Sequence, residues 1–268
     1  MNKRTSFYGL TFDPFDKEQL KVSDCFHSTD FDEALSRLNY IKDARGIGVL
    51  TAGSGMGKSY TIRCFIDSLN ANLYDFRYIC MSTVSVMDFY HQLCDTLGME
   101  ASGRKSAMFK MIQTQITSMR NSGRTLILFI DEAQFLKQSI LDDIRLLMNF
   151  EIDSRNCFTL ILSGEKSLNM RLNTPVNEAL RQRILTHYVF NGLTEEESAK
   201  YVLYKLQRAG GSKELINEAA LSAVSAKALG CPRLIDQLMT VAMMIGSQNN
   251  KVVIDAETIE AAVDLCSF

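Results

Sequence analysis

A glycine-rich run in the first quarter of the chain has the composition of a phosphate-binding loop. It reads Ala52-Gly53-Ser54-Gly55-Met56-Gly57-Lys58-Ser59. An apolar segment precedes this run and a helical pattern follows it, which is the context that such a loop needs. Glycines let backbone N–H groups turn toward an anion, and the helix that follows presents its positive N-terminus. The spacing predicts that residues 52–59, with Tyr60 beside them, bind the phosphates of a nucleotide.

Two side chains of this loop have predicted roles toward ATP and Mg²⁺. Lys58 would bridge the β- and γ-phosphates, and the Ser59 hydroxyl would ligate Mg²⁺. The strict pattern starts with glycine where this chain has Ala52, which is a mild departure because three glycines remain. A dinucleotide fingerprint is disfavoured, since Lys58 stands where that motif needs glycine or alanine.

Two adjacent acids follow an apolar segment about 70 residues further on. Asp131 and Glu132 come directly after Leu126–Ile130. If that strand lies beside the phosphate-binding loop, Asp131 would hold Mg²⁺ together with Ser59. Glu132 would polarise the attacking water as a general base. An acidic loop after any strand is the alternative, and the phosphate-binding loop upstream weakens it.

Three arginines could stabilise negative charge on a γ-phosphate. Arg181 and Arg183 stand just before the last apolar segment, and Arg233 follows Pro232 at the start of a helical pattern. A guanidinium placed there would assist phosphoryl transfer. A solvated surface arginine remains the alternative for each, more so for Arg181 than for Arg233.

The elements that must position these residues alternate between strand and helix. The strand patterns are mostly continuously apolar, as in buried parallel strands. They cover residues 48–51, 76–81, 126–130, 158–162 and 187–190, and helical patterns between them cover 58–68, 86–97, 107–120 and 138–150. After residue 193 only helical patterns occur, at 195–209, 214–228, 232–245 and 256–264. We expect an α/β fold, a three-layer P-loop core with a parallel five-stranded sheet, followed by a small all-helical lid. The expected domains are an N-terminal segment (1–45), the core (46–192) and the lid (193–268).

Composition limits the class of protein. The 268 residues are 46% hydrophobic and 22% charged, with a net charge of −2, which excludes a disordered chain or a coiled-coil rod. No apolar run approaches the ~20 residues that span a bilayer, and no apolar stretch follows the basic N-terminus as in a signal peptide. The seven cysteines form no CxxC pair. We expect a soluble cytoplasmic protein with no membrane partner, with reduced thiols and without structural zinc.

The whole chain resembles the ExeA-like branch of the AAA+ ATPases, which includes transposition helper ATPases akin to the target-selection ATPase of phage Mu. The resemblance rests on the phosphate-binding loop and on residues 7–15, 130–134, 146–151, 180–184, 209–210 and 230–233. It implies that Arg183, or its neighbour Arg181, is an arginine finger that acts on the ATP of the next subunit. It also implies that Arg233 is the lid arginine that senses the γ-phosphate, and that ATP binds between protomers of a homo-oligomer, a ring or a filament.

Two further points follow from the resemblance. Phe12, Pro14 and Phe15 would line the adenine pocket, although plain core packing explains these residues equally well. The family commonly ends its fourth strand with Gly-Gln-Pro-Glu-Leu, where this chain has Gly-Glu-Lys-Ser-Leu at 164–168. The residue that orients the attacking water is therefore open between Ser163 and Glu165, and slow hydrolysis is expected.

A local positive stretch points to double-stranded DNA as a partner. Residues 101–130 contain no acid and five basic residues, Arg104, Lys105, Lys110, Arg120 and Arg124. Arg104 and Lys105 follow Gly103 in a predicted loop, where they could contact a phosphate backbone together with Lys110. Such binding would be sequence-nonspecific and sensitive to salt. A solvated helix face explains the stretch equally well.

The motifs and the resemblance together favour an ATP-dependent DNA-binding ATPase that oligomerises on DNA and assists a transposase in target selection and strand transfer. The first alternative is a secretion- or envelope-associated AAA+ ATPase. The second is an ATP switch that binds partners without hydrolysis, and a replication-loader role is third.

Overall fold

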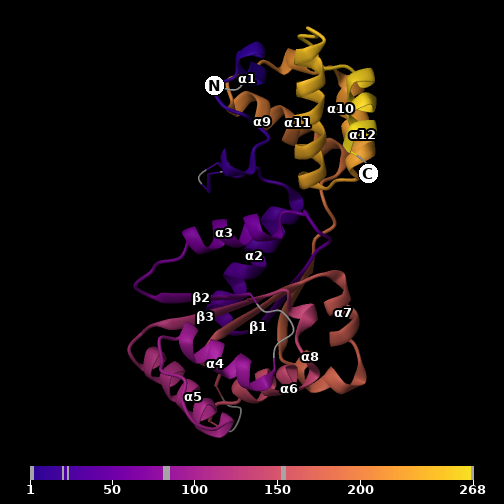
Figure 1. Cartoon of the computed structure of the whole chain (residues 1–268). Helices are drawn as coiled ribbons and strands as arrows, with labels where there is room; N and C mark the ends of the chain where they lie inside the picture. The colour runs from indigo at the N-terminus through magenta and orange to yellow at the C-terminus, as the bar shows by residue number, and fades with distance from the viewer. Residues whose placement is uncertain (1–2, 20, 23, 81–84, 152–154, 267–268) are drawn as a thin grey trace. The chain divides into compact units, whose positions relative to one another are not determined.

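The computed structural model describes residues 3–19, 21–22, 24–80, 85–151 and 155–266 (Figure 1). The chain forms two compact units, each with a hydrophobic core of its own. The sheet unit comprises Glu33–Ser54 and Phe65–Phe190. The helical unit comprises Met1–Asp32, Gly55–Cys64 and Asn191–Phe268. Residues 1–32 of the expected N-terminal segment therefore belong to the same compact unit as the C-terminal helices, and residues 33–45 belong to the sheet unit.

The described residues of the sheet unit form a parallel five-stranded sheet in the order β2-β3-β4-β1-β5. The strands are β1 (Gly46–Thr51), β2 (Tyr74–Cys80), β3 (Thr125–Asp131), β4 (Thr159–Gly164) and β5 (Ile184–Val189). This arrangement confirms the predicted α/β class. The non-consecutive order makes β1 an interior strand between β4 and β5.

Burial explains which strands the apolar pattern locates well. Every residue of β1 and β4 is buried, as expected for strands covered on both faces. The outer strand β5 alternates between half-buried and exposed residues over its first four positions. Its apolar pattern is therefore diluted, and the strand expected at 187–190 begins earlier, at Ile184. The strand expected at 76–81 ends at Cys80, and Met81 lies outside the described residues.

Helices cover both faces of the sheet (Figure 1). On one face α4 (Val86–Thr96), α5 (Lys105–Asn121) and α6 (Gln138–Leu147) share a core with the strands. On the other face lies α2 (Thr29–Ala44), whose Ile41 carbonyl accepts a hydrogen bond from the Thr159 hydroxyl at 3.1 Å. A Cβ on Gly48 would lie 3.3 Å from Thr186 Cγ2 on β5 and in ordinary contact, at 3.5 Å, with Ile41 Cγ1. Three layers result, as predicted.

The helical unit is built from α1 (Lys3–Phe7), α9 (Glu195–Arg208), α10 (Glu218–Ala228), α11 (Pro232–Gln248) and α12 (Ala256–Cys266). The helix expected over 214–228 divides in two. A 3₁₀ turn covers Lys213–Leu215, and α10 begins at Glu218. The break occurs because the Asn217 side chain accepts a hydrogen bond from the Ala220 N–H at 2.8 Å, which caps the new helix.

The N-terminal segment is part of the core of the helical unit. Tyr8, Leu10 and Phe15 are buried among residues of the C-terminal helices. The Thr11 N–H donates to the Ala209 carbonyl at 2.8 Å, and the Tyr8 hydroxyl donates to the Lys251 carbonyl at 3.2 Å.

Within the described residues, no helix has the length and apolar character needed to cross a bilayer.

An ion pair is buried in this core. The Lys205 ammonium lies 2.7 Å from the Asp236 carboxylate, and the Lys205 side chain is 1% exposed. The Tyr201 hydroxyl also donates to Asp236, at 3.1 Å, and the ammonium lies 5.4 Å from the ring centre of Phe15. Burial lowers the pKa of Lys205 and raises that of Asp236, while their mutual attraction opposes both shifts.

We expect Asp236→Ala to destabilise the helical unit strongly, because it leaves the Lys205 ammonium buried without its carboxylate. The loss should be about 3–5 kcal/mol of unfolding free energy, the usual effect of breaking a buried pair. Chemical denaturation followed by circular dichroism measures it. Glu196→Ala is the matched control, because it removes the exposed pair with Lys200 and should cost below about 0.5 kcal/mol. Equal effects of the two changes would contradict the prediction.

Candidate nucleotide-binding site

The loop between β1 and α3 (Lys58–Asp67) has backbone conformations that favour glycine. Gly55 has φ +80° and Gly57 has φ +89°, both in the left-handed region. The Gly57 carbonyl accepts hydrogen bonds from the N–H groups of Tyr60 and Thr61, each at 3.0 Å, which starts the helix. Lys58 and Ser59 therefore stand in the first turn of α3, as the motif requires.

Arg233 lies against this loop within the helical unit. It is the second residue of α11, and its N–H donates to the Gly55 carbonyl at 3.4 Å. A Cβ built on Gly55 would come within 2.7 Å of Arg233 Cβ and 2.9 Å of Cys231 Sγ. The sequence-predicted sensor arginine and the phosphate-binding loop are thus brought together. Glycine at 55 is required by this close approach as well as by its backbone angle.

The departure at the start of the motif is accommodated in the sheet unit. Ala52 is 1% exposed, and its N–H donates to the Gly164 carbonyl at 3.1 Å. Its methyl group is therefore buried. Ala52 extends the pairing of β1 with β4 by one residue. The methyl group therefore does not disturb the backbone angles of the glycines that follow.

Asp131, at the end of β3, is held by donors from neighbouring strands. The Ser163 hydroxyl donates to Asp131 Oδ1 at 2.8 Å, and the Tyr78 hydroxyl donates to Oδ2 at 3.2 Å. Burial, together with the charge of Asp131, raises the pKa of Tyr78, so the phenol keeps the proton that it donates. Ser163 is fully buried. Its hydroxyl therefore orients the carboxylate predicted to bind the metal.

Glu132 has an unusual backbone and a fixed side chain. Its φ is +53°, a left-handed conformation that costs a non-glycine residue on the order of 1–3 kcal/mol and is often found at functional sites. The Gln134 amide donates to Glu132 Oε2 at 2.6 Å. The Gln134 side-chain oxygen in turn accepts the Glu165 N–H at 3.1 Å. A Cβ on Gly164 would lie 2.5 Å from this oxygen, so glycine there makes room for the bridge.

The sequence analysis missed Gln134 as a site residue. It lies two positions after Glu132, inside the motif that carries the resemblance, and that position was its only signal. Of the two candidates for orienting the attacking water, Ser163 contacts Asp131 and Glu165 offers its backbone N–H to Gln134. A role of either toward water stays a prediction.

A second polar bridge lies at the carboxyl end of the sheet. Asn169, on α7 (Lys166–Leu172), donates to the Thr51 hydroxyl oxygen at 2.8 Å and lies 2.8 Å from His187 Nε2 on β5. Burial, and to a lesser degree the charge of Arg37, lowers the pKa of His187, so the ring is neutral near pH 7. The imidazole can then donate to the Asn169 oxygen. No motif pointed to this bridge.

The other predicted site residues are placed as follows. Arg181 ends the short helix α8 (Glu178–Arg181) and is exposed, while Arg183 is half-buried in the turn before β5. Their role as a finger toward another subunit stays a prediction. Phe15 is buried in the core of the helical unit, and Phe12 is half-buried with the Arg208 guanidinium 5.8 Å from its ring centre. These contacts favour the packing interpretation, and the adenine pocket stays a prediction.

The donor groups fit Mg²⁺ better than a transition metal. The described residues contain no group of three or more His, Cys, Asp or Glu side chains that could hold a metal ion. Mg²⁺ commonly takes one or two protein oxygens and completes its shell with phosphate and water. The Asp131 carboxylate, oriented by two hydroxyl donors, can serve as such an oxygen ligand.

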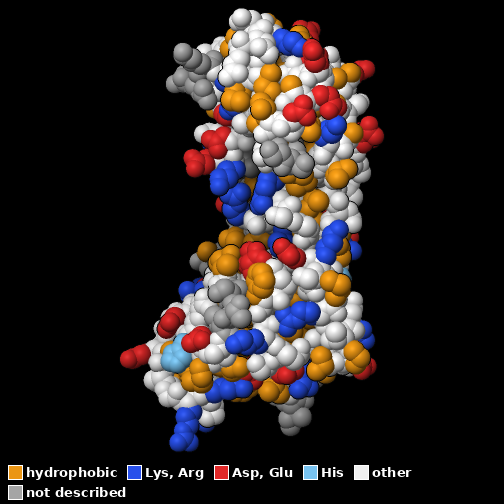
Figure 2. Space-filling model, turned by 45° about the vertical axis from the view of Figure 1, so that its right-hand side comes forward, with side chains coloured by type: hydrophobic (Ala, Val, Ile, Leu, Met, Phe, Trp, Pro, Cys, Tyr) orange, Lys and Arg blue, Asp and Glu red, His pale blue; other side chains and the backbone are white. Residues whose placement is uncertain are grey.

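The basic stretch is partly neutralised within the sheet unit. Lys105 lies 2.6 Å from the Asp143 carboxylate, whose side chain is 4% exposed. Arg120 donates to the Asn156 carbonyl, and Arg124 lies 3.9 Å from Asp75. Arg104, the N-cap residue before α5, and Lys110, on α5, are exposed. On the face drawn in Figure 2, Lys and Arg side chains are interspersed with Asp and Glu.

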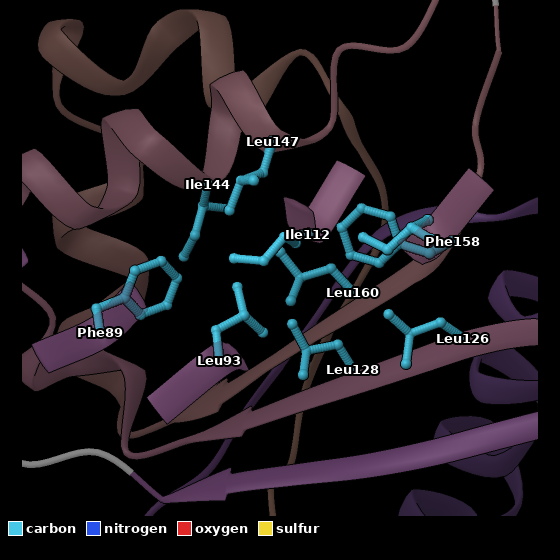
Figure 3. Close-up of a pocket in the computed structure, with 10 residues that line it drawn as sticks. Phe89, Leu93, Ile112, Leu126, Leu128, Ile144, Leu147, Phe158 and Leu160 are labelled. Atoms are coloured by element: carbon cyan, nitrogen blue, oxygen red, sulfur yellow. The ribbon is translucent and has the colours of Figure 1, made fainter. Parts of the chain in front are cut away.

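A cavity in the sheet unit is part of the core rather than a ligand site. Its volume is about 10 Å³, too small for a nucleotide. Figure 3 shows that side chains of α4, α5, α6 and the sheet converge on it, including Phe89, Ile112, Ile144 and Leu160. All the lining residues are apolar. This cavity is therefore not the predicted nucleotide site.

Comparisons with known proteins agree with this architecture. A family model described as an AAA domain matches residues 41–172. The chain is 28% identical over 243 residues to General secretion pathway protein A of Aeromonas hydrophila. The matched region covers 90% of this chain and 44% of that protein. The chain thus spans less than half of that relative's length.

Two solved structures have the same fold. Cdc6p from Pyrobaculum aerophilum has a TM-score of 0.68 at 15% identity, over 95% of this chain and 71% of that one. A chain of Drosophila ORC bound to DNA has a TM-score of 0.69 at 17% identity, over 98% of this chain and 65% of that one. With the parallel sheet and the glycine loop, these likenesses show a P-loop AAA fold followed by C-terminal helices.

We expect Gly55→Ala to weaken nucleotide binding at least about tenfold, because the added methyl group meets Arg233 and the left-handed backbone disfavours alanine. Titration with a fluorescent ATP analogue measures the affinity. Gly123→Ala is the matched control, since Gly123 has φ +82° and nothing within 4 Å of an added Cβ. It should lose some stability and keep the affinity. A loss of affinity shared by both variants would show that backbone strain alone is responsible.

Proposed function

We propose that this protein is an ExeA-like AAA+ ATPase that hydrolyses ATP slowly. The observation that carries the proposal is the left-handed glycine loop that opens α3, with Arg233 against it. Such a loop suits a polyphosphate, because its backbone N–H groups and the helix N-terminus face an anion. The chain therefore needs no specific base contact to hold the triphosphate.

In this proposal each residue of the two motifs has its own role in ATP binding or hydrolysis. Lys58 holds the β- and γ-phosphates, and Arg233 senses the γ-phosphate from the lid. The two motifs assign Mg²⁺ to Ser59 and Asp131, and when bound the ion would offset the charge that develops on the phosphate oxygens. Glu132 accepts the proton of the attacking water. Arg183, or Arg181, contributes from a neighbouring protomer to the ATP of the next one.

The hydrogen bond from Gln134 gives slow turnover a physical reason. A carboxylate oxygen that already accepts a hydrogen bond from the protein is less available to a water molecule. At 2.6 Å the Gln134 amide holds one oxygen of Glu132 in place. This oxygen then reaches the attacking water only when the contact with Gln134 loosens. The bridge from Gln134 to the Glu165 N–H links that event to the end of β4.

We further propose that the protein oligomerises on double-stranded DNA with ATP at subunit interfaces, and that it assists a transposase. With Lys105 paired to Asp143, Arg104 and Lys110 are the cations of the predicted set best able to reach DNA. Each neutralised phosphate contributes about 0.9 to the slope of log affinity against log salt. Because one protomer would neutralise few phosphates, it would bind DNA weakly. Assembly multiplies these contacts. The Drosophila ORC chain, which has a similar fold, is bound to DNA in its structure. DNA is therefore the first polymer to test.

A secretion-associated role is the second candidate. The similarity to General secretion pathway protein A of Aeromonas hydrophila favours it, since it extends over 90% of this chain. In that case the ATPase would respond to a protein partner, and DNA would leave its turnover unchanged. Both candidates share the nucleotide chemistry and differ in what controls it.

Steady-state ATP hydrolysis at low salt, with and without long duplex DNA, tests the proposed function. We expect DNA to stimulate turnover by at least about tenfold, because binding brings subunits together and completes each site. Glu132→Gln should bind ATP, stay assembled on DNA and lose turnover. Lys58→Ala is the control that should lose nucleotide binding itself. Turnover indifferent to DNA would favour the secretion-type role, and turnover equal to that of Lys58→Ala would favour a nonhydrolysing switch.

Replacing the bridging glutamine separates positioning from binding. We expect Gln134→Ala to change kcat by at least about fivefold and KM for ATP by less than about twofold, because only the pose of Glu132 is altered. Gln113→Ala, which removes a contact to the Asn149 carbonyl, is the control. A change confined to KM would give Gln134 a role in binding instead.

Charge substitutions on α5 test the DNA surface. The double change Arg104→Glu with Lys110→Glu should lower DNA affinity and flatten the slope of log affinity against log salt. Lys105→Ala should act differently. It leaves the buried Asp143 carboxylate without its partner, so it should reduce stability by about 3 kcal/mol and leave the salt slope unchanged. Filter binding at several salt concentrations, beside thermal denaturation, distinguishes these effects. Unchanged DNA binding in the double variant would make α5 a solvated helix face.

A further inference from the structure

Two cysteine thiols face each other in the helical unit. Cys25 Sγ and Cys64 Sγ are 3.0 Å apart, although 39 positions separate the two residues in the chain. Cys64 lies on α3 and is 7% exposed, while Cys25 is half-buried. The Cys25 thiol also lies 2.9 Å from the Val22 carbonyl, which fixes its direction. A disulfide needs about 2.05 Å between the sulfurs, so a shift of about 1 Å would complete the bond.

We propose that Cys25 and Cys64 are a redox modification site, at which a reversible disulfide fastens residues 21–28 to α3. This inference goes beyond the proposed ATPase function and does not depend on it. Disulfide formation would give the chain a covalent link between its N-terminal segment and the helix that begins with the phosphate-binding Lys58.

Neighbouring contacts already hold the two partners in register. The Tyr60 hydroxyl, one turn before Cys64 on α3, lies 3.1 Å from the Lys21 carbonyl and 3.2 Å from the Asp24 carbonyl. The hydroxyl of Tyr204, a residue of α9, donates to the Cys25 carbonyl at 3.4 Å. These hydrogen bonds tie Lys21, Asp24 and Cys25 to α3 and α9. Closing the disulfide therefore requires a small local adjustment rather than a search by a loose chain.

The two thiols have different parts in the reaction. Burial raises the pKa of the Cys64 thiol to about 12, so Cys64 is protonated at neutral pH. Half-buried Cys25 is the accessible sulfur. With hydrogen peroxide as oxidant, the Cys25 sulfur attacks one peroxide oxygen, the O–O bond breaks, and Cys25 sulfenic acid and one water form. Cys64 Sγ then attacks Cys25 Sγ. The S–O bond breaks, and the hydroxyl leaves with the Cys64 proton as a second water.

The bond would restrict the start of the phosphate-binding helix. Cys64 lies six residues after Lys58, less than two helical turns away on the same helix. A covalent link at this point prevents residues 21–28 from separating from α3 unless the hydrogen bonds and the disulfide both open. Lys21 is exposed at the edge of the segment, so cleavage after it by trypsin reports this opening.

Peptide mass spectrometry of the full-length protein tests the modification. The protein is treated with hydrogen peroxide, free thiols are blocked with N-ethylmaleimide, and the protein is digested without reductant. We expect a cross-linked peptide that joins Cys25 to Cys64 and disappears with dithiothreitol. Cys80→Ser, which removes an exposed thiol, is the control and should leave the cross-link intact. The proposal is overturned if Cys25 accumulates as sulfinic acid while Cys64 is alkylated, or if Cys25 pairs with another cysteine.

Proteolysis tests the mechanical consequence. Oxidised protein should be cleaved after Lys21 at least about tenfold more slowly than reduced protein, because opening now requires strain in a closed covalent loop. Cys64→Ala should show no difference between peroxide-treated and reduced samples, and comparable circular dichroism shows that it is folded. Equal cleavage rates of oxidised and reduced wild type would contradict the fastening. Neither readout uses ATP, so a failure here is distinct from a failure of the proposed ATPase function.

Discussion

The parallel pairing of β1, β3 and β4 is the constraint on which the sheet unit depends. In a parallel sheet the carboxyl ends of all strands meet at one edge. The register pairs Leu50 with Ser163 and Ile130 with Leu162, so the residues that follow these pairs emerge side by side. Continuous burial of these strands holds the register, because a slip by one residue would exchange the two faces of each strand.

Polar contacts at that edge are a direct result of this register. Ser163 can reach Asp131 and Gln134 can reach the backbone of β4 only because the two strands are neighbours. The strained backbone of Glu132 persists because hydrogen bonds on both sides of it fix the turn. The catalytic carboxylate of the proposed ATPase is therefore positioned by bonds to the protein, before any ligand arrives.

The helical unit obeys a different constraint. Its core includes the N-terminal segment and a buried ammonium, and an ammonium is tolerated there only with a paired carboxylate and nearby aromatic rings. The same unit holds Gly55 and Gly57 of the glycine loop, Arg233 and the two facing thiols. Nucleotide sensing by Arg233 and a redox link at Cys64 would thus act within one compact unit.

The amino-acid sequence by itself determined the α/β class, the glycine loop and the two acids at the end of β3, because these depend on local pattern and on short spacing. It placed the start of β5 too late, because alternating exposure dilutes the apolar pattern of that strand, and it could not show that Lys105 pairs with buried Asp143. Only the tertiary structure decided the partners of Gln134, Asn169 and Cys25. Those contacts join residues from different elements, and a hydrogen bond or a sulfur contact between distant positions exists only after the chain has folded and placed both atoms within reach.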